Sequence, residues 1–193
     1  MKRILAMSIM MWLCFNGCSQ NRTNLTDREK KWNPYKEGQL LIFGRVDGLT
    51  DTIKIISASD NLYPDGIGSL KNERLRVLAR HKLPNSNKST ELVFLRIYAK
   101  SYKYPSGMDF EFFFNGDTFW GRGYAFDELE KYKEISVQTR YGKFNDVIRI
   151  EDNSNRPFDE SNITTIYWSN SVGYVKYERK DGTMCELINI IHL

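Results

Sequence analysis

Residues 108–123, Met-Asp-Phe-Glu-Phe-Phe-Phe-Asn-Gly-Asp-Thr-Phe-Trp-Gly-Arg-Gly, carry the clearest signal for the fold of this chain. Apolar side chains recur at every second position, which places Phe110, Phe112 and Phe114 on one face of an extended strand. Asn115-Gly116 comes next, and this dipeptide favours a tight turn because both residues tolerate positive φ. The chain then returns through residues 118–123. The stretch therefore predicts a β-hairpin with one apolar face.

The same alternation continues on both sides of this hairpin, in short runs separated by turn residues such as Asp47-Gly48 and Asp181-Gly182. It predicts short strands at residues 39–46, 52–56, 73–80, 92–100, 108–114, 118–123, 135–140, 147–150, 164–169, 174–178 and 183–190. Residues 125–133, rich in helix formers, predict one short helix. Short turns between strands imply antiparallel pairing, and a sheet this wide must curl, split or close. We expect a mostly β fold, an antiparallel meander curled into a partly open barrel or a two-layer sandwich.

The first residues have the pattern of a secretory leader. Lys2 and Arg3 precede an apolar stretch at residues 4–15, which is too short for an ordinary membrane-spanning helix. Gly17 and Cys18 end this region, and a polar segment follows up to residue 31. The pattern predicts a signal peptide at residues 1–17, a flexible tether at 18–31, and a single β-rich domain at 32–193.

The Gly17-Cys18 junction resembles the lipobox of bacterial lipoproteins, in a relaxed form similar to that of Bacteroides-like bacteria. The resemblance implies cleavage before Cys18 and attachment of acyl chains, palmitate among them, to this cysteine. Several acyl chains would hold the protein stably on a membrane. Ser19 stands where an aspartate would resemble an inner-membrane retention signal, so we expect an outer-membrane location, facing either the periplasm or the cell surface.

Two further segments resemble small uncharacterised lipoproteins of Bacteroides-like bacteria. They are Trp-Asn-Pro-Tyr-Lys-Glu-Gly-Gln-Leu-Leu-Ile-Phe at residues 32–43 and the stretch from Ile166 to Gly182, with its Ser-Asn-Ser-Val-Gly turn and terminal Lys-Asp-Gly. The resemblance implies the same location and a β-rich fold. It implies no activity and no catalytic residue.

Composition excludes several classes of function. Removal of Lys2 and Arg3 with the leader takes 28 basic residues to 26 against 24 acidic ones, so we expect no nucleic-acid partner. Two histidines and three cysteines are too few for a histidine-rich or cysteine-rich metal centre, and we expect no cofactor. After cleavage of the leader and acylation of Cys18, Cys185 would be the one remaining cysteine, with no second thiol to form a disulfide, and we expect it in the core.

Acidic residues near the 115–116 turn offer one route to chemistry. Asp109, Glu111 and Asp117 flank this turn, where opposing strands bring two carboxylates to the spacing of a glycoside hydrolase. The alternative is that Asp109 and Glu111 lie on the solvent face opposite the phenylalanines, paired with arginines such as Arg74 or Arg76. We favour this second interpretation and predict no catalytic residue.

Aromatic residues are more numerous than one alternating face requires. They either fill a second core layer or lie exposed, where rings stack on sugars or anchor a protein partner. Tyr102, Tyr104 and Trp120 are our candidates for a surface binding site. The sequence thus predicts a lipid-anchored envelope protein that acts by binding a glycan or an envelope protein, or as an assembly component. A carrier of an apolar ligand in a curled-sheet cavity and a carboxylate-based glycan hydrolase are the alternatives.

Overall fold

A single antiparallel sheet of eleven strands forms the part of the chain that the computed structural model describes, residues 22–64, 71–82, 89–114, 117–153 and 163–192. The strands are β1 (Leu40–Arg45), β2 (Thr50–Pro64), β3 (Lys71–Lys82), β4 (Ser89–Tyr98), β5 (Gly107–Phe114), β6 (Asp117–Ala125), β7 (Ile135–Gln138), β8 (Lys143–Glu151), β9 (Ile163–Ser169), β10 (Gly173–Arg179) and β11 (Met184–Ile191). Two helices of four residues each, α2 (Asp27–Lys30) and α3 (Phe126–Leu129), accompany them. The predicted fold class is confirmed, with a second short helix added to the one expected.

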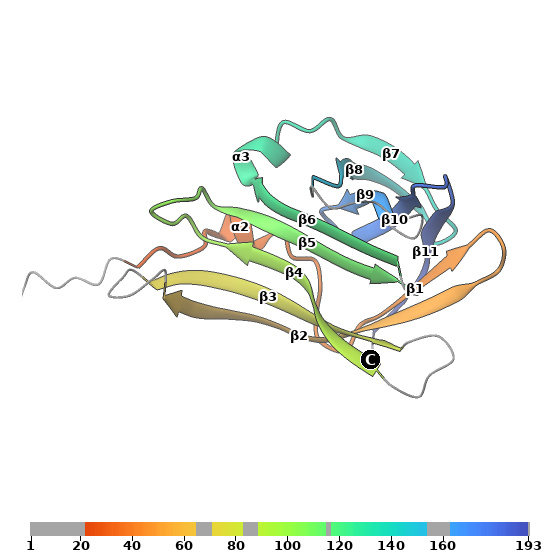
Figure 1. Cartoon of the computed structure of the whole chain (residues 1–193), viewed down its shortest axis with the longest axis horizontal. Helices are drawn as coiled ribbons and strands as arrows, with labels where there is room; N and C mark the ends of the chain where they lie inside the picture. Colours follow the sequence, from red (N-terminus) through yellow and green to blue (C-terminus); the bar gives the residue numbers. More distant parts are fainter. Residues whose placement is uncertain (1–21, 65–70, 83–88, 115–116, 154–162, 193) are drawn as a thin grey trace, which may run out of the picture.

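Strand order explains how the meander closes. The order across the sheet is β6-β5-β4-β3-β2-β1-β11-β10-β9-β8-β7, so sequence neighbours pair everywhere except where β1 meets β11. That pairing aligns Leu41 with Ile190 and joins the two ends of the domain. The edges of the sheet, β6 and β7, are consecutive in the chain but are not paired with each other. The sheet is therefore a curled half-barrel, open between these two strands (Figure 1).

Curling brings two wings of the sheet face to face. The first wing is β2–β6 and the second wing is β7–β10, and Figure 1 shows them as two layers joined through β1 and β11. Phe110 of β5 meets Trp168 of β9 with ring centroids 5.1 Å apart, and Phe112 meets Tyr177 of β10 at 5.1 Å. The predicted apolar face of the 108–114 strand is confirmed for Phe110 and Phe112, which are fully buried. The side chain of Phe114 lies outside the described residues.

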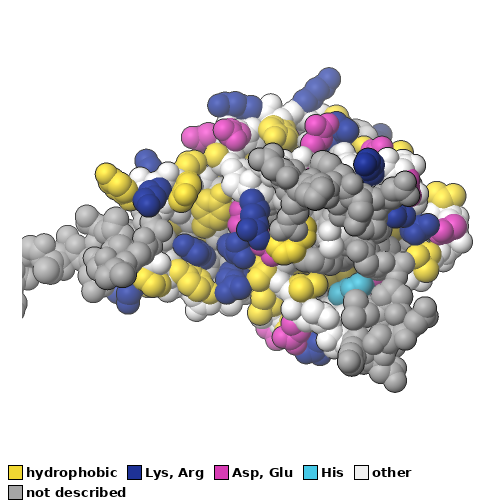
Figure 2. Space-filling view, viewed as in Figure 1, with side chains coloured by type: hydrophobic (Ala, Val, Ile, Leu, Met, Phe, Trp, Pro, Cys, Tyr) yellow, Lys and Arg dark blue, Asp and Glu magenta, His cyan; other side chains and the backbone are white. Residues whose placement is uncertain are grey.

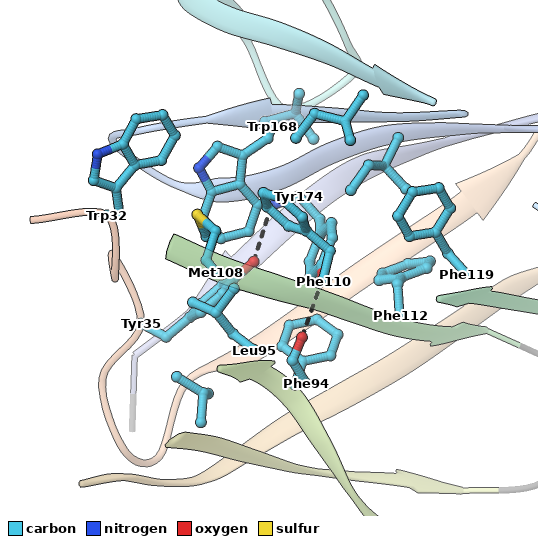
Figure 3. Packing of buried hydrophobic residues seen from close by; sticks show 14 of the residues in the cluster. Trp32, Tyr35, Phe94, Leu95, Met108, Phe110, Phe112, Phe119, Trp168 and Tyr174 are labelled. Atoms are coloured by element: carbon cyan, nitrogen blue, oxygen red, sulfur yellow. Dashed lines mark hydrogen bonds between the residues drawn. The ribbon is translucent and has the colours of Figure 1, made fainter. Parts of the chain in front are cut away.

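Tyr174 and Tyr35 link the wings at the centre of this core (Figure 3). The Tyr174 hydroxyl donates a hydrogen bond to the carbonyl oxygen of Phe94 at 3.0 Å, and the Tyr35 hydroxyl accepts one from the backbone N–H of Tyr174 at 2.8 Å. Burial raises the pKa of both phenols well above the ordinary value, so both remain protonated. Because aromatic rings and their hydrogen bonds occupy the space between the wings, an apolar ligand would have to displace them.

The segment expected to be a flexible tether is ordered from residue 22. Thr23 bridges to β3 beside Asn72, and Leu25 is only 6% exposed. Thr26 and Glu29 form a capping box that starts α2. Lys30 of α2 then donates hydrogen bonds to Asp60 and Glu73. The domain therefore begins about ten residues before the expected boundary, because one buried leucine and two ion pairs hold a segment that is otherwise polar.

The helix predicted at 125–133 is much shorter in the structure. Only Phe126 and Leu129 of α3 are buried, and Ala125 at its N-cap offers no side-chain acceptor. A single apolar turn gives little reason for a helix to continue once its next residues face water. Phe126 instead anchors the N-terminal segment, with its ring 5.7 Å from that of Trp32.

Candidate functional site

The outer face of the first wing carries arginines and aromatic rings in register. Arg74 and Arg76 of β3 lie opposite Tyr98 and Arg96 of β4, and Arg96 lies opposite Asp109 of β5. Alternate residues of these strands, such as Leu75, Val77 and Leu95, form the inner face and are buried. Figure 2 shows dark-blue Lys and Arg side chains gathered among yellow ones over β3 to β5. The period of two that builds the core therefore also assembles this polar face.

A pocket of about 260 Å³ opens at one end of this face, where β4 runs into the segment that leads to β5. It is smaller than a typical drug-sized pocket and is closer to the size of a single sugar ring. The residues that line it are Asn72, Arg74, Arg96, Tyr98, Ala99, Ser101, Tyr104 and Asp109. We call it the outer-face pocket.

The two carboxylates beside the outer-face pocket, those of Asp109 and Glu111, both form an ion pair with Arg96. The Asp109 Oδ2 accepts from Arg96 Nη1 at 2.8 Å, and its Oδ1 accepts from the backbone N–H of Gly123 at 2.9 Å. Glu111 lies 3.2 Å from Arg96 Nη2. Burial raises the pKa of Glu111 despite the opposing effect of Arg96. Asp109 thus keeps no oxygen without a donor.

The prediction that these two acids lie opposite the phenylalanines and pair with an arginine is confirmed, but it was wrong in two details. They face outward but are nearly inaccessible, Asp109 at 7% and Glu111 at 5% exposed, and the arginine that pairs with them is Arg96 rather than Arg74 or Arg76. Both follow from the strand register, since Arg96 lies directly opposite Asp109. The third acid, Asp117, has a side chain outside the described part of the chain.

Several hydrogen-bond donors of the pocket are left without a protein acceptor. Arg74 is held over the Tyr63 ring at 5.3 Å, and no carboxylate in the described ranges pairs with it. Asn72 is 2% exposed and uses its Oδ1 to accept from Thr23, so its amide N–H₂ is directed to no described acceptor. Burial and the nearby Asp109 raise the pKa of Tyr98 to about 12, so its hydroxyl keeps its proton at neutral pH.

Ser101 shapes the rim of the pocket. Its hydroxyl oxygen accepts from the backbone N–H groups of Lys103 and Tyr104, at 3.2 and 3.0 Å. These bonds fix a tight turn that brings the Tyr104 ring to the pocket. The Ser101 hydroxyl hydrogen remains for a ligand. The pocket therefore presents mainly donors, while the acceptor that lines it, Asp109, is already satisfied.

The three predicted surface aromatics occupy different places. Tyr104 lines the outer-face pocket and is 66% exposed, whereas Tyr102 on the same turn is 90% exposed and does not line it. Trp120 of β6 lies opposite Glu111 on the same outer face, with the Arg122 guanidinium 5.0 Å from its ring centroid. The structure brings only Tyr104 to the pocket.

Sequence reasoning missed Asn72, Arg74 and Tyr98 as site residues. The alternation in β3 placed Arg74 away from the core, but it gave no indication that this arginine would have no acidic partner. Asn72 is covered by Thr23, 49 residues away along the chain, and no local pattern reveals that contact. A signal did exist at Tyr98, an aromatic on the polar side of an apolar strand.

Several other expectations concern residues away from the pocket. Cys18 lies outside the described residues. Cys185 is fully buried in the core, as expected. Within the described ranges, no helix has the length and apolar character needed to cross a membrane. In the same ranges, no three His, Cys, Asp or Glu side chains are grouped as metal ligands would be.

The fold and the pocket define a curled antiparallel sheet with a small donor-lined site on its outer face. Comparison with known proteins adds no relative: no family model, no curated protein and no solved structure matches the chain.

Proposed function

We propose that this chain is a lipid-anchored bacterial envelope protein that binds a saccharide in the outer-face pocket and catalyses no reaction. The anchor is the acylated Cys18, and the location is the outer membrane. The observation that carries the proposal is the pocket itself: a one-ring volume lined by unpartnered donors, with the exposed ring of Tyr104 at its rim. Sugars are recognised in this way, by hydrogen bonds to hydroxyls and by stacking of the apolar ring face on an aromatic side chain.

The state of the nearby carboxylates supports binding over hydrolysis. A glycoside hydrolase needs one carboxylic acid and one carboxylate on either side of the bond that breaks. Here Asp109 and Glu111 share Arg96, and Asp109 also accepts the Gly123 N–H. Asp109, whose two carboxylate oxygens both accept hydrogen bonds from the protein, is therefore poorly placed to transfer a proton.

The test is retention of the purified full chain on a panel of immobilised neutral and acidic polysaccharides. We expect the wild type to be retained on at least one, and Tyr104→Ala to weaken binding about 3- to 10-fold, as expected for a lost aromatic contact. Tyr141→Ala is the matched control, because this tyrosine is 41% exposed but does not line the pocket. Absence of retention on every polysaccharide, or release of shortened sugars during incubation, would overturn the proposal.

A separate labelling experiment tests the anchor. Palmitate incorporation into the wild type and Cys18→Ala, expressed in a bacterial host and separated into membrane and soluble fractions, should give label and membrane association only in the wild type. An unlabelled, soluble wild type would refute the anchor and leave the pocket to be tested by the polysaccharide panel.

A further inference from the structure

We propose that the ligand of the outer-face pocket is an acidic sugar, one that carries a single carboxylate, and that Arg74 binds this carboxylate. The inference rests on the proposed function, because it specifies the saccharide that the same pocket takes. It follows from the hydrogen-bonding character of the pocket, its charge, and the way Arg74 is held.

Among the described side chains that line the pocket, the charged group left free is a donor, the Arg74 guanidinium, whereas each oxygen of the one carboxylate, Asp109, already accepts a hydrogen bond. The groups without a described protein acceptor are the Arg74 guanidinium, the Asn72 amide N–H₂, the Tyr98 hydroxyl and the hydrogen of the Ser101 hydroxyl. The oxygens of Asp109 are both occupied. A neutral sugar has hydroxyls that donate as well as accept, and its donors would find few partners here. A carboxylate accepts only, so it matches this set.

Charge on the face favours a ligand with one negative charge. The described arginines of the outer face, Arg74, Arg76, Arg96 and Arg122, outnumber the carboxylates Asp109, Glu111 and Glu128, the last of which acts electrostatically on Tyr98. Arg96 is neutralised by Asp109 and Glu111, so Arg74 is the pocket cation without a carboxylate partner. The fixed charge of Asp109 at the pocket wall disfavours a doubly charged phosphate ester more than a carboxylate.

Arg74 is held in place before any ligand arrives. Its guanidinium lies 5.3 Å from the Tyr63 ring centroid, and Arg76 lies 5.9 Å from the same ring while it donates to the Tyr63 hydroxyl at 3.3 Å. Tyr63 thus stabilises two neighbouring guanidinium groups on adjacent positions of one face. A guanidinium that is already ordered loses less conformational entropy when it binds a carboxylate with two parallel N–H groups.

Chain length limits the distance between the pocket and the proposed anchor. Thr23 donates to Asn72 in the pocket wall, and Cys18 precedes Thr23 by five positions. Five residues span at most about 18 Å even when fully extended. An acidic sugar of a membrane glycolipid and one of a soluble polysaccharide could both reach a site at this distance, and the two sources call for separate experiments.

The first experiment is titration calorimetry of the full chain with a galacturonate trisaccharide and with a galactose trisaccharide, which differ in the carboxylate. We expect the acidic trisaccharide to bind at least tenfold more tightly to the wild type. Arg74→Gln should abolish this preference, so that the two trisaccharides bind this variant with equal affinity. Arg122→Gln is the matched control, since Arg122 lies on the same face, is held over an aromatic ring, and does not line the pocket.

A parallel experiment distinguishes the source of the sugar. Vesicles that contain a glucuronosyl diacylglycerol are sedimented with the wild type, the soluble full-length Cys18→Ala variant and its Arg74→Gln derivative, against vesicles with a galactosyl lipid. Preference for acidic vesicles that requires Arg74, without affinity for the soluble trisaccharide, assigns a glycolipid. Affinity for the trisaccharide assigns a soluble source. Either result supports the proposal.

Two results would overturn it, and they are distinguishable from failure of the proposed function. Tyr104-dependent binding of neutral sugars with no preference for the carboxylate would refute the acidic sugar but keep the saccharide pocket. Equal losses in Arg74→Gln and Arg122→Gln would show general attraction between charges rather than a site. Absence of binding to every sugar and vesicle would refute the proposed function together with the inference. Unchanged thermal unfolding of each variant establishes that the fold is intact.

Discussion

Replacing Gly173 with alanine should destabilise the domain far more than the same change at Gly48. Both glycines have φ of +87°, so alanine meets the same backbone strain at each, about 1–2 kcal/mol. Their surroundings differ. A Cβ on Gly48 would have no atom within 4 Å, whereas a Cβ on Gly173 would lie 2.0 Å from the Tyr35 hydroxyl oxygen and 2.3 Å from Cζ of that ring.

Tyr35 has nowhere to move. It is 3% exposed, it packs between Phe94 and Trp168 of opposite wings, and its hydroxyl accepts the Tyr174 N–H. Crowding of a well-packed core costs about 1–3 kcal/mol, and a buried N–H that loses its acceptor costs about 1–3 kcal/mol more. We therefore expect Gly173→Ala to lower the free energy of unfolding by about 2–6 kcal/mol more than Gly48→Ala does.

Urea unfolding, followed by tryptophan fluorescence, measures this difference, because the buried Trp168 indole is 5.9 Å from the Tyr35 ring. A Gly173→Ala variant too unstable to fold, beside a folded Gly48→Ala, satisfies the expectation. A difference between the two variants of less than about 1 kcal/mol would refute the reasoning, since it would mean that Tyr35 gives way without loss of its contacts.

Three further changes test the same structure. Tyr35→Phe leaves the Tyr174 N–H without an acceptor and should lower the free energy of unfolding in urea by about 1–3 kcal/mol. An unchanged free energy of unfolding would contradict the proposal that this hydrogen bond links the two wings. Leu25→Ala should lower the free energy of unfolding by about 2–4 kcal/mol, because this side chain is 6% exposed. The control Leu62→Ala, at a side chain 40% exposed, should change it by less than about 1 kcal/mol. Equal effects of the two substitutions would mean that the N-terminal segment is not part of the core. Burial raises the pKa of Glu111, so its folded-state pKa exceeds the unfolded one, and its contribution to stability is present at low pH and lost as pH rises through the folded pKa. The melting temperature of Glu111→Gln, measured relative to that of the wild type, should therefore rise as the pH increases from 4 to 8. A difference that stays constant over this range would show that the ion pair with Arg96 fully compensates the burial of the Glu111 carboxylate.

The strands were predictable because their signals are local. Alternation around Phe110 and Phe112 and the turn at Asp47-Gly48 depend on residues only a few positions apart, and the structure has both. The helix at 125–133 was predicted too long, because helix propensity does not say how many of its residues find a partner in the core.

The binding pocket was predictable only at its rim. Tyr104 was expected at the surface, and it is exposed. The roles of Arg74 and Asn72 depend on their neighbours in the fold. Arg74 is held by Tyr63 of the preceding strand, and Asn72 is hydrogen-bonded by Thr23, which lies in a segment that was expected to be a flexible tether. Whether an arginine is paired or unpaired depends on strand register, and register follows from bulges that the sequence does not reveal.

By itself, the sequence determined that this chain forms short antiparallel strands in the order of a meander, because side-chain alternation and turn dipeptides act over two to four residues. Only the tertiary structure decided that β1 pairs with β11, that Tyr35 is enclosed between wings, and that the donors of the outer-face pocket converge. The reason is physical: these contacts join residues as much as 151 positions apart, as Leu40 and Ile191 are, and their energy depends on shape and burial created by the complete fold.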